Sequence, residues 1–159
     1  MKKLLTLMAL AFALCSACKK DDSAKATGDN SWTLAGVTYK TTIGYKTTTS
    51  GGSVTALYNF FDATPSATVK VNSLSLSFVE APTASGTYQL VGVGQAKTAK
   101  QFEIAAGTVA PLAYAYIGSS VDIAVNVAGG KVKVVIPEIS MKCTTTNPDV
   151  KLTASVQEM

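Results

Sequence analysis

The residue types present in this chain limit the chemistry that it could perform. Its 159 residues include 14 Lys and 10 acidic side chains, but neither Arg nor His. His is the side chain that most often serves as a general base or a zinc ligand. Arg supplies the bidentate pairs that usually hold phosphate or carboxylate groups. The composition therefore disfavours enzymes and binding proteins that depend on either residue.

Carboxylates remain the main candidates for acid–base chemistry. After residue 31 they are Asp62, Glu80, Glu103, Asp122, Glu138, Asp149 and Glu158. A sugar hydrolase needs two carboxyl groups that converge across a cleft, whereas each of these residues is expected at a turn or at an outward strand position. Their spacing does not match a calcium loop, and no glycine-rich motif indicates a nucleotide. We therefore assign no catalytic, cofactor-binding or metal-ligating residue.

Cys18 has the surroundings of a residue that undergoes a covalent reaction. Two Lys residues precede an apolar run from residue 4 to residue 14, and the small residues Ser16 and Ala17 come just before Cys18. This order is typical of a signal peptide that is cut after residue 17. The run is shorter than the ~20 apolar residues of a transmembrane helix.

The same stretch resembles the lipobox of bacterial lipoproteins at Ser16, Ala17 and Cys18, and it departs from that family at Cys15, where Leu is usual. The resemblance implies that residues 1–17 are a lipoprotein signal peptide and that Cys18 is acylated on its sulfur and on its new amino group. Acyl chains contribute ~0.8 kcal/mol of membrane affinity per buried methylene, so three chains would anchor the protein. An ordinary secretory signal cut near Ala17 is the alternative.

The residues after Cys18 carry a second resemblance. Lys20-Asp21-Asp22 is similar to the export tag of Bacteroidetes-type lipoproteins, which implies the outer face of the outer membrane, with the periplasmic face as the alternative. Asp22-Ser23-Ala24 resembles the O-glycosylation sequon of the same group, which implies modification of Ser23. Residues 18–31 lack apolar periodicity and are predicted to be a flexible tether.

Cysteine and charge counts exclude two further classes. If Cys15 leaves with the signal and Cys18 is acylated, Cys143 has no partner for an intrachain disulfide. Without His to activate it, Cys143 is expected to be a half-buried strand residue rather than a nucleophile. The 14 Lys include the two at positions 2 and 3, so the chain from Cys18 onward has 12 Lys against 10 acids, a charge of +2. This small, scattered charge does not indicate a nucleic-acid partner.

From Trp32 onward, apolar and polar residues alternate with a period of two, which predicts strands. Residues 69–78 show this alternation clearly, and residues 121–136 predict a hairpin that turns at Gly129-Gly130. Pro137 cannot donate a ladder hydrogen bond and is expected at an edge, a bulge or a break.

These patterns predict about nine to eleven short strands and no helix after the signal, hence an all-β antiparallel β-sandwich. A closed or partly open lipocalin-like β-barrel is the alternative. Residues 32–159 are predicted to form a single globular domain. The motifs Trp32-x-x-x-Gly36-x-x-Tyr39 and Pro82-x-x-x-Gly86-x-Tyr88 resemble those of small uncharacterised Bacteroidetes lipoproteins. Trp32 and Tyr39 are expected to pack at one end of the core.

Three functions are compatible with these expectations. Strand faces rich in Ser, Thr, Asn and Lys favour a non-catalytic binding or structural module of the cell envelope, whose partner is a glycan or an envelope protein. A lipocalin-like carrier of a small apolar ligand is an alternative, although Asn30 replaces the Gly of that family's opening Gly-x-Trp. An envelope glycan hydrolase is a second alternative, for which Asp122 and Glu138 are the acids to test.

Overall fold

The computed structural model describes residues 30–50, 53–109 and 112–159. The predicted signal peptide, Cys18 and Ser23 lie outside these ranges, as does all of the predicted tether before Asn30. Within the described ranges, no helix has the length and apolar character needed to span a membrane.

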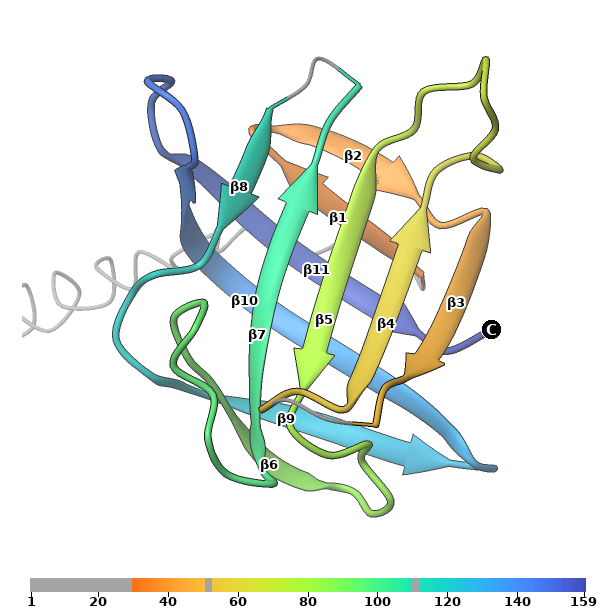
Figure 1. Ribbon diagram of the computed structural model, residues 1–159, viewed down its shortest axis with the longest axis vertical. Helices are drawn as coiled ribbons and strands as arrows, with labels where there is room; N and C mark the ends of the chain where they lie inside the picture. The colour runs from red at the N-terminus through yellow and green to blue at the C-terminus, as the bar shows by residue number, and fades with distance from the viewer. Residues whose placement is uncertain (1–29, 51–52, 110–111) are drawn as a thin grey trace, which may run out of the picture.

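The described residues form eleven β-strands and no helix (Figure 1), which confirms the all-β prediction. The strands are β1 (Ser31–Leu34), β2 (Val37–Lys40), β3 (Ile43–Thr48), β4 (Ala56–Phe61), β5 (Ser73–Phe78), β6 (Gly86–Leu90), β7 (Gln101–Gly107), β8 (Ala113–Ala115), β9 (Val121–Ala128), β10 (Lys131–Cys143) and β11 (Val150–Gln157).

All of these strands belong to one hydrogen-bonded sheet with the order β2-β1-β11-β10-β9-β6-β7-β5-β4-β3, and β8 pairs with both β10 and β7. The pairings β10–β9–β6–β7–β8 therefore return to β10 and close a barrel. Strands β5, β4 and β3 extend this barrel from β7, and β11, β1 and β2 extend it from β10. In Figure 1 the β3–β4–β5–β7 layer lies in front of β9, β10 and β11, whose strands cross it steeply. The body thus has two facing layers, as in a sandwich, but a closed ring of strands joins them.

The core lies between the two layers and is rich in aromatic side chains. Phe78 is fully buried and stacks on Phe102, with 4.8 Å between the ring centroids. Tyr58 and Tyr88 meet the same ring edge-on. Offset-stacked and edge-on pairs are the favoured aromatic arrangements. Trp32 is also fully buried and stacks on Tyr39 at 5.5 Å, as the sequence predicts for one end of the core.

The hairpin between β9 and β10 and the irregularity at Pro137 are both confirmed. Gly129 and Gly130 have φ values of 58° and 76°, the positive φ that a tight hairpin turn requires. The register of β10 against β11 shifts between Ile136 and Ile139, so Pro137 lies in a β-bulge within a continuous strand.

The strand predicted over residues 69–78 begins only at Ser73, so its first part is wrong. The side chain of Asp62 accepts hydrogen bonds from both the backbone N–H (2.8 Å) and the side-chain amide (2.5 Å) of Asn72. The amide oxygen of Asn72 in turn accepts a bond from the backbone of Val109. These side-chain bonds hold residues 62–72 as a loop, because they offer the backbone an alternative to a strand ladder.

Candidate functional site

The structure places Cys143 at the end of β10, where it is half-buried, as predicted. Its sulfur lies 3.1 Å from the hydroxyl of Thr145. Hydrogen bonding from Thr145 lowers the pKa of Cys143, with a smaller contribution from Asn147. These contacts stabilise the turn that follows β10.

Most of the carboxylates considered as catalytic candidates have structural partners. Asp62 fixes the β4–β5 loop through Asn72. Glu103 on β7 accepts hydrogen bonds from the backbone N–H groups of Gly94 (2.9 Å) and Ala96 (3.0 Å) and so fixes the β6–β7 loop.

The remaining carboxylates are divided between ion pairs and solvent. Asp149 pairs with Lys142 at 3.0 Å, and Glu138 and Glu158 form two further ion pairs that are described below. Glu80 and Asp122 are exposed. Asp122 lies opposite Gln89 of β6, whereas Glu138 lies in the bulge of β10 beside β11, so the two acids have different neighbours. No group of three or more His, Cys, Asp or Glu side chains suited to a metal ion occurs within the described ranges.

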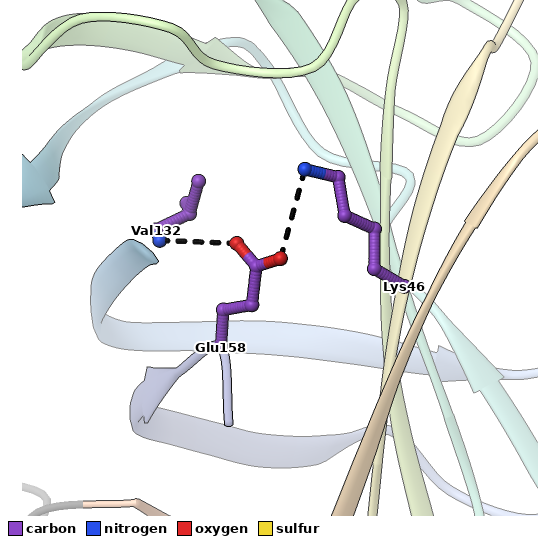
Figure 2. Close-up of polar contacts among 3 residues, drawn as sticks. All are labelled: Lys46, Val132 and Glu158. Carbon is purple, nitrogen blue, oxygen red and sulfur yellow. Dashed lines mark hydrogen bonds and ion pairs between the residues drawn. The ribbon is translucent and has the colours of Figure 1, made fainter. Parts of the chain in front are cut away.

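One polar cluster joins the edge strand β3 to the residue that follows β11 and to β10. We call Lys46, Tyr58 and Glu158 the seam cluster. The backbone N–H of Glu158 donates a hydrogen bond to the carbonyl of Val132 on β10 at 2.8 Å. One carboxylate oxygen of Glu158 accepts from the N–H of Val132 at 3.3 Å, and the other lies 3.6 Å from the Lys46 ammonium (Figure 2). Glu158 thereby ties β3 to β10.

Tyr58 lies beneath this ion pair. The ammonium of Lys46 lies 5.3 Å from the centroid of the Tyr58 ring, within cation–π range. The Tyr58 side chain is 2% exposed, and its hydroxyl has no hydrogen-bond partner among the described residues. The cavity beside it has a volume of only about 60 Å³. It is large enough for a water molecule but too small for an organic ligand.

The pKa values of the seam cluster follow from this packing. Burial raises the pKa of Tyr58 above its ordinary value of 10.0, and the nearby Lys46 ammonium offsets only part of that rise. Burial alone would lower the pKa of Lys46, but the neighbouring Tyr58 and Glu158 side chains together raise it above 10.5. Both groups therefore keep their protons more tightly in the folded protein.

A second candidate region, whose wall is mostly apolar, lies on the outer surface where β1, β11 and β10 run side by side. We call it the outer groove. It has a volume of about 430 Å³, and its walls include Thr33, Ala35, Gly36, Glu138, Lys151 and Thr153. Thr153 is the most buried of these residues, at 4% exposure, and its hydroxyl has no hydrogen-bond partner among the described residues.

Two local backbone features form the walls of the outer groove. The β1–β2 turn consists of Ala35 and Gly36, with φ values of 53° and 79°, and the N–H of Ala35 bonds to the carbonyl of Lys151 at 3.0 Å. On the other side of β11, Ile136 pairs with Ala154 and Ile139 with Leu152, so the bulge residues Pro137 and Glu138 stand opposite Thr153. This alignment places Glu138 3.6 Å from the Lys151 ammonium.

No protein-family model matches the chain, and no curated protein or solved structure is significantly similar to it.

The sequence predictions included neither the seam cluster nor the outer groove. Lys46 and Glu158 lie near opposite ends of the domain sequence, and no local motif signals their contact. Thr153 occupies a position that alternation assigns to the solvent-facing side of β11, yet both faces of this strand are buried from Leu152 to Val156. The Ala35-Gly36 turn, inside the motif from Trp32 to Tyr39, and Pro137 at the bulge were the local sequence signals near the outer groove.

Proposed function

We propose that this protein is a membrane-anchored, surface-exposed lipoprotein that acts as a non-catalytic binding or structural module of the cell envelope. The observation that carries the non-catalytic part is the use of its acidic side chains. Asp62 and Glu103 fix loops, and Glu138, Asp149 and Glu158 form ion pairs with Lys. Asp62, Glu103 and Glu158 thus hold loops and strands together, whereas Glu138 and Asp149 lie in exposed ion pairs. This distribution is not the pair of carboxyl groups converging across a cleft that a sugar hydrolase needs.

The anchor part of the proposal depends on the sequence around Cys18. An apolar run, two small residues, the cysteine and a charged segment follow one another in the order of a bacterial lipoprotein signal. Asn30 and β1 begin the described domain twelve residues after Cys18, so a short segment would separate the lipid from the first strand. The Lys20-Asp21-Asp22 resemblance supports the outward-facing location.

The core packing gives less support to the lipocalin-like carrier. A carrier of this kind holds its apolar ligand between the layers of the barrel. In this protein Phe78, Phe102, Tyr58 and Tyr88 meet one another in that space. A ligand there would have to separate these rings, and loss of aromatic contacts is costly.

Detergent phase partitioning tests the anchor. The full chain is expressed in a Bacteroidetes host, which both acylates lipoproteins and exports those with such a tag, beside the variants Cys18→Ser and Cys143→Ser. We expect the wild type and Cys143→Ser to enter the detergent phase and Cys18→Ser to stay in the aqueous phase, because only Cys18 receives acyl chains. Labelling of intact cells with a membrane-impermeant amine reagent then tests exposure of the Lys side chains at the cell surface.

Two results would contradict this proposal. An aqueous wild-type protein would exclude the lipid anchor. A detergent-phase protein that is labelled only after the outer membrane is broken would place the domain on the periplasmic face instead.

A further inference from the structure

The outer groove is shaped by two irregular backbone segments that meet across β11. Ala35 is a non-glycine residue with φ 53°, a conformation that L residues adopt reluctantly. The β-bulge at Pro137 sets Glu138 opposite Thr153 along the strands, in a sheet whose other β10 pairs are regular. Bulges and strained residues recur beside binding sites, where they redirect side chains. A Cβ atom at Gly36 would meet no other atom within 4 Å, so this wall faces open space.

The Thr153 hydroxyl is the strongest indication that a polar ligand enters the outer groove. Its side chain is 4% exposed, and the hydroxyl has no partner within the described part of the chain. Thr33, directly opposite on β1, already shares a hydrogen bond of 2.8 Å with Thr38. Buried polar groups almost always have a partner in folded proteins. A ligand hydroxyl in the groove would supply the missing bond once a rotation of the Thr153 side chain exposes the oxygen.

The charged side chains around the outer groove balance one another. Lys151 pairs with Glu138 and also donates to the hydroxyl of Ser140 at 3.0 Å. Lys142, which is not itself part of the wall, pairs with the lining residue Asp149. Two ammonium groups therefore face two carboxylates, and all four side chains are at least 39% exposed. Such a rim offers hydrogen-bond donors and acceptors without favouring an anion or a cation.

We propose that the outer groove binds a neutral glycan. This inference rests on the proposed function and names the ligand class for it. Sugar rings carry hydroxyls that both donate and accept hydrogen bonds beside apolar C–H faces. The rim supplies the complementary donors and acceptors, Thr153 supplies a buried hydroxyl, and Ala35 and Val150 supply apolar contact. The volume of about 430 Å³ lies in the range of small-molecule sites, so the groove holds a short glycan segment.

The position of the groove fits presentation to a glycan outside the cell. The chain enters the domain at Ser31, at one end of β1, and the Ala35-Gly36 wall lies beyond the other end of this strand.

Amide NMR spectra of the full chain in detergent micelles test the proposal. The protein is titrated separately with maltohexaose, cellohexaose, mannohexaose and chitohexaose, and with the acidic hexamer of galacturonic acid. We expect at least one neutral hexasaccharide to shift the amide signals of Ala35, Gly36 and Thr153. The acidic hexamer, which has a similar length, should leave these signals in place.

The variant Thr153→Val removes the groove hydroxyl and keeps the shape of the side chain. We expect it to weaken binding of the neutral glycan by roughly 3- to 10-fold, the typical effect of one lost hydrogen bond. The matched control is Thr47→Val on the exposed strand β3, which should bind within about twofold of the wild type. Because the Thr153 hydroxyl has no partner within the protein, Thr153→Val should fold at least as well as the wild type.

Several results would overturn the groove proposal. These are shifts with the acidic hexamer alone, shifts confined to other surfaces, no shift with any of the five sugars, or unchanged affinity in Thr153→Val. If an envelope protein crosslinks to Lys151 and none of the sugars competes with it, the groove binds a protein partner instead of a glycan. Each of these results leaves the anchored-module proposal standing, because phase partitioning judges that proposal separately.

Discussion

The seam cluster and the outer groove are built from the same kinds of groups but differ in the space around them. Each has a Lys–Glu pair at 3.6 Å and a buried hydroxyl without a partner among the described residues. In the seam cluster, the Lys46 and Glu158 side chains are 34% and 19% exposed beside a cavity of about 60 Å³. In the outer groove, Lys151 and Glu138 are 62% and 39% exposed beside about 430 Å³.

This difference indicates that one arrangement of groups can serve two purposes. At the seam, the backbone of Glu158 is already bonded to Val132 of β10. The Glu158 carboxylate strengthens this contact and links it to Lys46 of β3. At the groove, Glu138 lies in a bulge and its partner Lys151 extends into solvent. Exposed ion pairs contribute little to stability. We therefore assign the seam cluster to stability and the outer groove to binding.

The largest effect is expected from removing the two glutamates in turn. Glu158→Ala deletes the hydrogen bond to Val132 and leaves Lys46 without its ion pair, which should cost about 1–3 kcal/mol of unfolding free energy. Glu138→Ala, the matched change in the outer groove, should cost less than about 1 kcal/mol. Urea unfolding followed by circular dichroism measures both. Equal losses, or a larger loss for Glu138→Ala, would remove the distinction between the two regions.

A smaller effect is expected from removing the two buried hydroxyls. Thr153→Val deletes a buried hydroxyl without a partner among the described residues, so it should raise the unfolding free energy by roughly 1 kcal/mol. Tyr58→Phe also removes a group that stabilises the Lys46 ammonium, so its gain should be smaller. Only Thr153→Val should weaken neutral-glycan binding. Differential scanning calorimetry measures the change in stability, and the NMR titration measures the affinity for the glycan. A gain in stability together with a loss of binding at Thr153, but not at Tyr58, would sharpen the comparison, and destabilisation of either variant would count against it.

The turn at the wall of the outer groove should give a still smaller gain. Ala35→Asn places a residue that tolerates positive φ at a position with φ 53°, so we expect about 0.5 kcal/mol of stabilisation. The reverse change at the β9–β10 turn, Gly129→Ala, should destabilise the protein because φ there is 58°. Thermal unfolding of both variants checks the pair. A destabilised Ala35→Asn would mean that Ala35 makes a contact that the turn geometry does not explain.

The smallest expected effect is the pH dependence that the seam cluster gives to the unfolding free energy, because this dependence is absent at neutral pH. The pKa of Lys46 is raised, so its contribution is fully present below pH 10.5 and is lost as the pH rises through the higher folded value. The pKa of Tyr58 is also raised, so above pH 10.0 the unfolded chain releases this proton first and stability falls as well. Urea midpoints should stay level from pH 7 to about 9 and decline above about 10. Tyr58→Phe should decline less steeply, whereas Glu138→Gln should follow the wild type, and identical slopes for all three would refute this assignment.

The sequence predicted the strands well where burial alternates along one face. The hairpin of β9 and β10 and the final strand β11 follow from a period of two together with glycine and proline positions. The strand predicted over residues 69–78 begins only at Ser73, because Asp62 and Asn72 bond to each other and hold the preceding residues in a loop. A pattern of apolar residues carries no record of such side-chain bonds.

Neither the seam cluster nor the outer groove could be predicted, because each depends on the alignment of strands that are distant in the sequence. The outer groove requires the register that sets Thr33 opposite Thr153 and the bulge beside it, and only the bulge had a local signal, Pro137. The seam cluster requires closure of the sheet, which includes the parallel pairing of β6 with β7. Parallel neighbours are joined by long connections, so their pairing leaves no short-range signature.

Mass spectrometry of the amino-terminal peptide tests the central claim most directly, because the binding role presupposes a domain held at a membrane through Cys18. The protein is extracted from membranes of the expression host and digested, and its first peptide is identified. We predict a peptide that begins at Cys18 and carries acyl chains on its sulfur and amino groups. An unmodified peptide that begins at Cys18, or a first residue at any other position, would contradict the account.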